Sequence, residues 1–315
     1  MRVVFMGTPD FSVPTLEKII EAGHEVIGVV TQPDKAKGRG KKVLFPPVKE
    51  KALEHNLPVY QPKRAREPEF IEQMRELNPD VMVVVAFGQI LPKALLDIPK
   101  YGCVNVHASL LPKYRGAAPI QWAVIRGEKV SGVTTMQMDV GLDTGDMLMK
   151  TEVALAEDET GGSLHDKLSV LGGELLIETL KGLEAGTIQP EKQDDSQTGE
   201  YARMLDKALG KVDFSMPAEE IERLIRGLNP WPSAYTFYHG KTMKLWKAKV
   251  VSADADGEAA APGQILSVDK KGFTVQTGAG ALRILELQME GKKRMDAGAF
   301  LRGCSMAAGE ILGQE

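Results

Sequence analysis

Apolar positions in the first half of the chain follow two alternating patterns. Short apolar runs rich in β-branched residues, at 3–6, 24–31 and 80–87, are separated by stretches in which apolar residues recur every three to four positions. The second pattern is typical of amphipathic helices and covers residues 13–22 and 69–77. Strands that alternate with helices in this way predict an α/β domain with a mostly parallel, doubly wound sheet covered by helices on both faces.

A different pattern follows a long predicted helix at residues 164–184. Pro190 lies in a polar run with little apolar content, which is typical of a surface linker. Beyond it, one short amphipathic helix precedes alternating strands that glycine-containing turns separate, so a small β-barrel is predicted. We therefore expect a first domain at residues 1–186, a linker at 187–205 and a second domain at 206–315.

Composition places the chain among soluble globular proteins. Of its 315 residues, 43% are hydrophobic and 26% are charged, and this length suits about two domains. Cys103 and Cys304 lie far apart among apolar or small residues, so neither a disulfide framework nor a metal site is indicated. No apolar run approaches the ~20 residues that span a bilayer, and no secretion signal precedes the first strand. We therefore expect a cytoplasmic location.

Charge is unevenly distributed along the chain. The net charge of −4 argues against a nucleic-acid partner. Residues 206–315 are nearly neutral, with 15 basic and 14 acidic side chains. The exception is residues 31–49, a basic arm in which six Lys and Arg side chains accompany one acid, Asp34. Lysine-rich stretches are usually only solvated, but GRG at residues 38–40 predicts an arm flexible enough to order on a nucleic acid.

Several common catalytic signatures are missing. After the first predicted strand, Gly7 is followed by Pro9 and Ser12 where a dinucleotide-binding loop has glycines. The one GKT triplet, at residues 240–242, lacks the upstream glycine of a phosphate-binding loop. Neither G-x-S-x-G nor H-E-x-x-H occurs. The sequence therefore disfavours an NAD enzyme, a kinase, a serine hydrolase of that type and a zinc protease.

Two polar residues interrupt the buried strand that ends in GCVNVH. Alternation places Val104 and Val106 on one face, and Asn105 and His107 together on the other. Ligands of open α/β sheets usually bind at such strand ends, so these two side chains form a candidate site. In isolation, a turn satisfied by Asn105 and a buried hydrogen bond of His107 would explain the pair equally well.

Four segments make the chain resemble the methionyl-tRNA formyltransferase family nearly from end to end. They are GTPDF from Gly7, TQPDKAKGRGKK from Thr31, NVHASLLPKYRGAAPIQ from Asn105 and GVTTMQMDVGLDTGDML from Gly132, and NPWPSAY from Asn229 supports the second domain. The third and fourth segments mark the wider group of formyltetrahydrofolate-dependent enzymes. Within that group, the basic arm and the second domain point to the methionyl-tRNA formyltransferases. The resemblance implies a Rossmann-like formyltransferase domain and a C-terminal OB-like barrel. It also implies 10-formyltetrahydrofolate as formyl donor and the α-amino group of methionyl initiator tRNA as acceptor.

By that resemblance, Asn105, His107 and Asp143 form the catalytic trio. When an amine attacks a formyl carbon, the formyl oxygen gains negative charge that Asn105 and His107 can stabilise with hydrogen bonds. Asp143 would orient His107 and help to remove the proton of the amine. Taken alone, Asp143 in its DTG sequence is more typical of an Asx turn, and its occurrence with the other two favours catalysis.

The resemblance also implies a folate site in the same cleft. Main-chain groups of two segments would hold the pterin ring, and a third segment would line the cleft. The three segments are Gln89, Ile90 and Leu91; Val140, Gly141 and Thr144; and Ser109, Leu110, Leu111 and Pro112. Taken alone, FGQILP is a strand that ends in a turn, and SLLP is a proline-terminated loop.

For the tRNA, the resemblance implies that the basic arm grips the acceptor stem. Arg39, Lys41 and Lys42 would contact phosphates or base edges. In the second domain Lys244 and Lys247 are candidate contacts, although their spacing of three breaks the period of two that would put both on one strand face. OB-type folds commonly bind nucleic acid. No protein partner is indicated, and we expect a monomer.

Three rival functions share parts of this pattern. A formyltransferase for an amino sugar attached to a nucleotide would share the fold and the trio, but it has little use for GRGKK. A non-catalytic folate- or RNA-binding protein would not need an intact trio. A hydrolase that releases formate would replace the amine by water, and such enzymes generally carry a different accessory domain.

Overall fold

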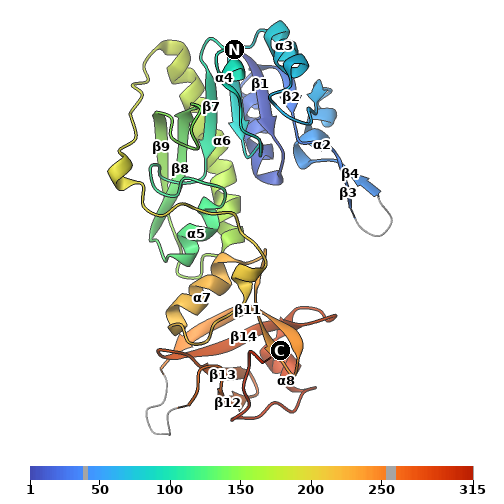
Figure 1. Cartoon of the computed structure of the whole chain (residues 1–315), viewed down its shortest axis with the longest axis vertical. Helices are drawn as coiled ribbons and strands as arrows, with labels where there is room; N and C mark the ends of the chain where they lie inside the picture. Colours follow the sequence, from blue (N-terminus) through green and yellow to red (C-terminus); the bar gives the residue numbers. More distant parts are fainter. Residues whose placement is uncertain (38–41, 253–259, 315) are drawn as a thin grey trace. The chain divides into compact units, whose positions relative to one another are not determined.

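The chain folds into two compact units, each with its own sheet and core (Figure 1). The computed structural model describes residues 1–37, 42–252 and 260–314. Within these ranges, no helix is long and apolar enough to cross a membrane. Unit 1 comprises Met1–Pro119, Val130–Ala154 and His165–Ala202, and unit 2 comprises Ile120–Lys129, Leu155–Leu164 and Arg203–Glu315.

Unit 1 is built on a seven-stranded mixed sheet in the order β5-β2-β1-β6-β7-β8-β9. Its strands are β1 (Arg2–Gly7), β2 (Glu25–Val30), β5 (Val59–Tyr60), β6 (Val81–Val85), β7 (Cys103–His107), β8 (Val130–Gln137) and β9 (Met147–Ala154). Neighbouring strands run parallel from β5 to β7, and β8 and β9 then add two antiparallel pairings. The mostly parallel, doubly wound sheet predicted from the strand–helix alternation is confirmed.

Helices cover both faces of this sheet. They are η1 (Asp10–Ser12), α1 (Val13–Glu21), α2 (Pro47–Glu54), α3 (Pro68–Leu77), α4 (Lys93–Leu96) and α6 (Gly161–Ala185) from His165 onward. On one face, Phe70 of α3 and Leu95 of α4 share a core cluster with Cys103 of β7. On the other, α6 approaches β7 so closely that a Cβ on Gly172 would lie 2.9 Å from Val106. Successive residues of β7 therefore face different helices.

The connections of the sheet change direction between β1 and β6. From β1 the chain winds outward through β2 to β5 and returns on the other side of β1, which creates a topological switch point. There the hydroxyl of Thr8 donates to the carbonyl of Phe87 at 3.2 Å, and that of Ser12 donates to Val85 at 2.6 Å. A Cβ on Gly7 would lie 2.8 Å from the Cβ of Ser12, so glycine allows this approach. The GTPDF segment and the Ser12 that follows it thus hold the end of β6 and the loop after it.

Unit 2 contains an antiparallel sheet in the order β10-β11-β14-β13-β12, with β15 paired to β14. Its elements are α5 (Pro119–Ile125), η3 (Ala208–Gly210), α7 (Ala218–Gly227), β10 (Ala234–Tyr238), β11 (Lys241–Val251), β12 (Ile265–Asp269), β13 (Gly272–Gln276), β14 (Ala281–Met289), β15 (Met295–Asp296) and α8 (Ala297–Leu301). Ile221 and Ile225 of α7 are buried in one cluster with Leu245, Phe273 and Ile284 of the sheet. The predicted short helix followed by alternating strands is confirmed.

The C-terminal tail joins the two edge strands of this sheet. The amide of Leu312 donates to the carbonyl of Gly263 at 2.8 Å, next to β12, and the amide of Gly313 donates to Phe237 of β10 at 2.9 Å. Leu312 is 3% exposed and belongs to the core of the unit. Among the described strands, β10 and β12 are the two ends of the hydrogen-bonded order and do not pair with each other. The tail lies between them, which fits the partly open barrels of OB folds.

We expect Leu312→Ala to lower the free energy of unfolding by about 2–5 kcal/mol, because it removes a buried side chain and leaves a cavity. Ile311→Ala is the matched control: Ile311 is 43% exposed, and its replacement should cost within about 0.5 kcal/mol. Urea unfolding followed by tryptophan fluorescence measures both, since Trp122, Trp231 and Trp246 all belong to unit 2. Equal effects would contradict the packing of the tail in the core.

Candidate active site

Asn105 and His107 lie on the same face of β7, as the alternation predicts. They lie at every second position from Cys103 and so on its face of the strand, which packs toward α3 and α4. Val106, on the opposite face, packs toward α6. Both side chains are largely buried, with 9% and 6% of their surface exposed. His107 is the last residue of the strand, at the carboxyl edge of the parallel part of the sheet. Open α/β sheets bind their ligands at this edge.

Asp143 reaches His107 from the loop between β8 and β9. Its Oδ2 lies 3.8 Å from Nδ1 of His107 and accepts a 2.9 Å hydrogen bond from the amide of Gly116. A different acid holds the turn of this loop, because Asp139 accepts a 2.7 Å hydrogen bond from the hydroxyl of Thr144. An Asx-turn role therefore fits Asp139, and the carboxylate of Asp143 is directed across the site.

The loop after β7 orients His107. Its Nε2 lies 3.0 Å from the carbonyl oxygen of Tyr114. Because a carbonyl only accepts, Nε2 carries the hydrogen, and in the neutral ring Nδ1 is the unprotonated nitrogen that faces Asp143. Nδ1 can therefore take up a proton next to a carboxylate that stabilises the imidazolium. In the described ranges, no three His, Cys, Asp or Glu side chains are grouped as a metal site.

Two of the candidate folate loops expose apolar side chains. Ile90 after β6 is 80% exposed, and Val140 and Leu142 between β8 and β9 are 70% and 54% exposed. Gln89 instead holds the chain before α3, because its Oε1 accepts a 2.6 Å hydrogen bond from the amide of Ala65. Exposed apolar side chains on the loops at a candidate ligand site are available to cover a ligand.

The third candidate segment, residues 109–112, is held by Thr134 of β8. The hydroxyl of Thr134 donates to the carbonyl of Ser109 at 2.7 Å and accepts from the amide of Leu111 at 3.1 Å. Ser109 and Leu111 are buried, whereas Leu110 and Pro112 are partly exposed and can face a ligand. Of the other predicted contacts, Leu91 is buried in the core, and Gly141 and Thr144 belong to the turn that Asp139 holds.

The basic arm includes a two-stranded hairpin of β3 (Lys35–Lys37) and β4 (Lys42–Leu44). Of the three tRNA contacts predicted in the arm, Arg39 and Lys41 lie outside the described residues. The main chain of Lys42 begins β4. The structure therefore places the two strands that flank the GRG sequence.

Asp34, the one acid of the arm, is bound at the base of the hairpin. It accepts hydrogen bonds from Nζ of Lys49 at 2.6 Å and from the side-chain Nε2 of Gln61 at 2.8 Å. Lys49, and then Gln61, hold the pKa of the Asp34 carboxyl below its usual range by stabilising the charged form. The acid is thereby paired with the last lysine of the arm.

A β-bulge puts the predicted lysines of β11 on one face. Leu245 and Lys247 pair with consecutive residues of β14, which leaves Trp246 as the extra, bulged residue. A second shift follows on β14 between the partners of Lys247 and Ala248. Leu245 is buried and Ala248 packs against the core, so Lys244 and Lys247 both lie on the side away from the core despite their spacing of three. The ring centre of Trp246 lies 5.7 Å from Nζ of Lys244 and 5.0 Å from the guanidinium carbon of Arg294.

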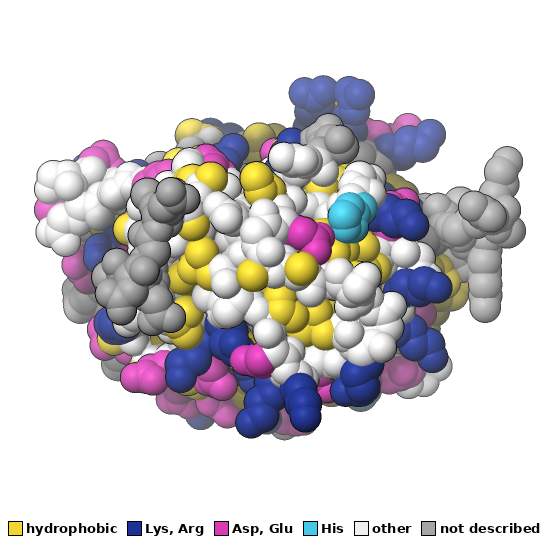
Figure 2. Space-filling model, turned by 90° about the horizontal axis from the view of Figure 1, so that it is seen from below, with side chains coloured by type: hydrophobic (Ala, Val, Ile, Leu, Met, Phe, Trp, Pro, Cys, Tyr) yellow, Lys and Arg dark blue, Asp and Glu magenta, His cyan; other side chains and the backbone are white. Residues whose placement is uncertain are grey.

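Charges of both signs lie on the one face of the molecule that Figure 2 shows. On the face that Figure 2 shows, Lys and Arg side chains gather along the border, and acidic, hydrophobic and uncharged groups lie among them. A nucleic-acid contact on that face would therefore depend on a local cluster of basic side chains and not on the charge of the whole face.

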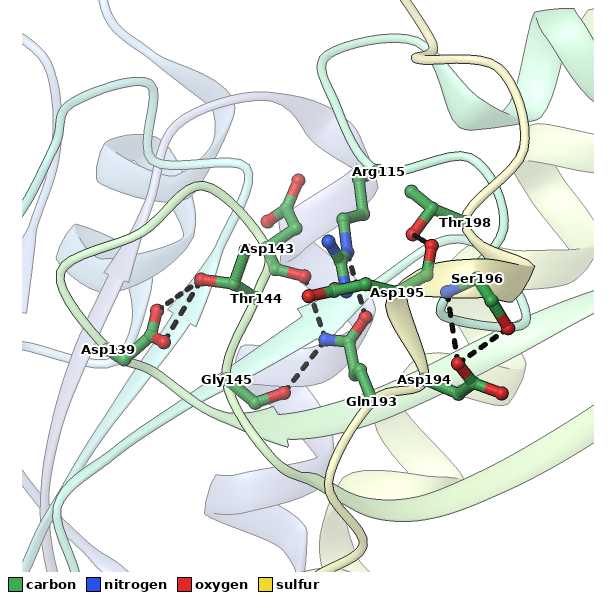
Figure 3. Close-up of polar contacts among 10 residues, drawn as sticks. All are labelled: Arg115, Asp139, Asp143, Thr144, Gly145, Gln193, Asp194, Asp195, Ser196 and Thr198. Atoms are coloured by element: carbon green, nitrogen blue, oxygen red, sulfur yellow. Dashed lines mark hydrogen bonds and ion pairs between the residues drawn. The ribbon is translucent and has the colours of Figure 1, made fainter.

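The sequence interpretation missed the support that residues 187–202 give to the site. Gln193 lies in the segment expected to be a linker, but it is 7% exposed and bonds both the loop of Asp143 and the side chain of Arg115 (Figure 3). Its signal in the sequence is weak, because it stands in the polar run QDDSQTG. Arg115 lies within a recognised segment, yet nothing in its spacing predicts this contact.

Comparison with known proteins identifies the family. Residues 1–180 match the family described as "Formyl transferase", and residues 204–305 match "Formyl transferase, C-terminal domain". A methionyl-tRNA formyltransferase of Lachnospira eligens is 59% identical over 316 residues and covers 100% of both chains. One of Clostridioides difficile is 55% identical over 313 residues, 99% of this chain and 100% of the relative. The chain belongs to the methionyl-tRNA formyltransferase family.

Solved structures share the fold of this family at much lower identity. An N-formyltransferase from Helicobacter canadensis, solved with folinic acid and dTDP-3-aminofucose, is 18% identical and has a TM-score of 0.67. The match covers 94% of this chain and 100% of that one. At such identity the likeness extends to the fold alone. Full-length sequence identity, and not the fold, therefore separates the methionyl-tRNA formyltransferase family from the amino-sugar rival.

Proposed function

We propose that this protein transfers the formyl group of 10-formyltetrahydrofolate to the α-amino group of methionyl initiator tRNA, which supplies N-formylmethionyl-tRNA for translation initiation. The observation that carries the proposal is the identity of 59%, over the full length, to a methionyl-tRNA formyltransferase. The convergence of Asn105, His107 and Asp143 at one strand end supports it, because the reaction needs an oxyanion donor and a route for a proton.

Asn105 is the proposed donor to the formyl oxygen. Attack of the amine makes the formyl carbon tetrahedral and moves negative charge onto its oxygen, where a fixed N–H donor is most effective. The small exposed fraction of Asn105 limits competition from water. When the intermediate collapses, the bond from the formyl carbon to the folate nitrogen breaks and the formyl group stays on the amine.

His107 and Asp143 are the proposed route of the proton. The attacking amine becomes positively charged and must lose a proton, which Nδ1 of His107 can accept. Oδ2 of Asp143, 3.8 Å away, stabilises the imidazolium that results. The same proton can then pass to the folate nitrogen as that nitrogen leaves, so no covalent enzyme intermediate is needed.

The pterin is proposed to lie against main-chain groups of residues 89–91 and 140–144, with residues 109–112 lining the same cleft. Exposed Ile90 and Val140 provide apolar surface beside those main-chain groups. A flat, fused ring with amide-like edges suits an apolar slot with polar groups at its rim.

Two parts of the chain are proposed to bind the acceptor stem of the tRNA. One is the β3–β4 hairpin with Arg39, Lys41 and Lys42, and the other is the outward face of β11 with Lys244 and Lys247. The bulge supports the second, because it places both lysines on one side of the strand, with Lys244 beside the ring of Trp246. Unpaired RNA bases stack on such rings, and lysines neutralise phosphates.

We expect the double substitution Lys244→Ala, Lys247→Ala to weaken tRNA binding and to make its salt dependence shallower. If each lysine neutralises one phosphate, the slope of log affinity against log salt falls by about 1–2. Filter binding between 50 and 300 mM salt measures the slope. Lys270→Ala, in the exposed turn after β12, is the matched control. An unchanged slope in the double variant would remove β11 from the tRNA site.

We further propose a cytoplasmic monomer that needs no protein partner, with residues 1–186 as catalytic domain, 187–205 as linker and 206–315 as tRNA-binding domain. The proposed catalytic and folate residues all belong to unit 1, so one chain supplies them. The proposed linker packs on unit 1 as far as Ala202.

The decisive experiment mixes the protein with 10-formyltetrahydrofolate and initiator tRNA, either charged with methionine or uncharged, and follows formyl incorporation. We expect incorporation with charged initiator tRNA alone. Formate release without incorporation would favour a hydrolase, and transfer to a nucleotide-linked amino sugar instead of tRNA would favour the rival formyltransferase.

A further inference from the structure

Gln193 uses all of its side-chain polar atoms inside unit 1. Its Nε2 donates to the carbonyls of Asp143 and Gly145, each at 2.8 Å, and its Oε1 accepts from Nε of Arg115 at 2.9 Å (Figure 3). Because the side chain is 7% exposed, water hardly competes with these bonds. A carboxamide satisfies all three contacts, which neither a carboxylate nor an ammonium group does.

The two loops that Gln193 joins are the ones that contact His107 and Asp143. The first is the loop of Asp143 itself. The second contains Arg115, which stands between Tyr114 and Gly116. Nε2 of His107 donates to the carbonyl of Tyr114 at 3.0 Å, and the amide of Gly116 donates to Asp143 at 2.9 Å. One carboxamide therefore connects the supports of both side chains.

Both loops also adopt backbone conformations that need support. Asp143 has a φ of 55° and Tyr114 a φ of 58°, in the left-handed region that residues other than glycine seldom occupy. Such conformations persist where the surrounding structure holds them. Gln193 binds the carbonyl of Asp143 directly, and it fixes the side chain of the residue after Tyr114.

We propose that Gln193 is a positioning residue for formyl transfer, which holds the Asp143 carboxylate against His107 by joining their two loops. The role rests on the proposed function, because it acts through two of the proposed catalytic residues. Gln193 itself is not expected to touch a substrate.

Other contacts of the same segment also hold the loop of Arg115. One is an ion pair exposed to solvent, and the others are hydrogen bonds between main-chain groups. Arg115 also pairs with Asp195 at 2.9 Å, but the Asp195 side chain is 85% exposed, and exposed ion pairs contribute little. The amide of Ala202 donates to the carbonyl of Arg115, and the amide of Ala117 donates to that of Ala202, both at 2.8 Å. The buried carboxamide is thus the side chain that reaches both loops.

Steady-state kinetics with both substrates varied test the role. Gln193→Glu keeps the length of the side chain and an acceptor for Arg115, but an ionised carboxylate cannot donate to the two carbonyls. We expect Gln193→Ala and Gln193→Glu to lower kcat about 10–100-fold, while each KM changes less than about threefold. Gln197→Ala is the matched control, an exposed glutamine of the same segment, and it should leave kcat within about twofold.

Double variants separate positioning from a general structural role. In an Asp143→Asn background the carboxylate that Gln193 holds is already gone, so Gln193→Glu should lower kcat less than about threefold further. In an Asn105→Ala background the full 10–100-fold loss should remain, since Gln193 does not bond Asn105. Equal losses in the two backgrounds, or a normal kcat in folded Gln193→Glu, would overturn the proposal.

Circular dichroism and urea unfolding establish which variants fold. If Gln193→Ala does not fold, Gln193→Glu alone tests the proposal. Failure of the proposed function looks different from failure of this inference. If the wild-type protein formylates another amine and not methionyl-tRNA, the proposed function fails, and the same double variants are measured with that amine. If the wild-type protein formylates methionyl-tRNA and the losses are equal, only the role of Gln193 fails.

Discussion

Asn105→Ala is expected to lower kcat for formyl transfer by about 10²–10³-fold, the usual cost of removing one donor to a developing oxyanion. The substitution removes the donor that lies in phase with His107 on β7 and leaves the other side chains of the site in place. KM for the folate should change little, because the donor acts mainly on charge that appears in the transition state. Single-turnover formylation of methionyl initiator tRNA measures the effect directly.

Asn105→Asp is the informative companion to that variant. It keeps the size of the side chain but places a negative charge where the oxyanion forms, so its kcat should fall at least as far. Unfolding curves of both variants guard against a trivial loss of structure. If either variant, folded, keeps kcat within about threefold of the wild type, Asn105 is not the oxyanion donor.

Asp143→Asn is expected to lower kcat by about 10²–10⁴-fold, the range for removing a group that takes part in proton transfer. The substitution keeps an oxygen that can accept the 2.9 Å hydrogen bond from the Gly116 amide, so the loop should persist. What it removes is the negative charge 3.8 Å from Nδ1 of His107, which stabilises the imidazolium. Rapid-quench kinetics at saturating folate and tRNA measure the loss.

Asp146→Asn is the matched control for that charge. Asp146 is an exposed acid of the same loop, and its replacement should leave kcat within about twofold. A similar decline in both variants would point to the net charge of the loop. A normal rate in Asp143→Asn would remove Asp143 from the proton route.

The elements of the fold were largely predictable because they depend on neighbours in the chain. The apolar run after Asp80 forms β6, and the amphipathic stretch at residues 69–77 lies within α3. Periodicity reports which face of a segment is buried, and burial then selects the secondary structure. The same reasoning put Asn105 and His107 on one face of β7, which the structure confirms. Their catalytic roles stay a prediction.

Spacing alone left the shared face of two lysines open, because a local irregularity changes the period there. Lys244 and Lys247 violate the period of two, and the bulge at Trp246 restores a common face for them. A bulge depends on how two strands register with each other, so the sequence of one strand does not reveal it. The burial of Leu312 likewise depends on tertiary structure, because a tail with few apolar residues joins the core where two sheet edges leave a gap for it.

By itself, the sequence determined the order and type of the elements, the formyltransferase family and the shared face of Asn105 and His107, because each is written in short segments. Only the tertiary structure decided how Asp143 is held 3.8 Å from His107 by the Gly116 amide. It also decided that Asp139, and not Asp143, holds the turn, and that Gln193 joins the two supporting loops. The contact of Gly116 with Asp143 spans 27 residues, and that of Arg115 with Gln193 spans 78. Such contacts form between loops whose paths depend on the packed sheet beneath them, and local pattern carries no information about that packing.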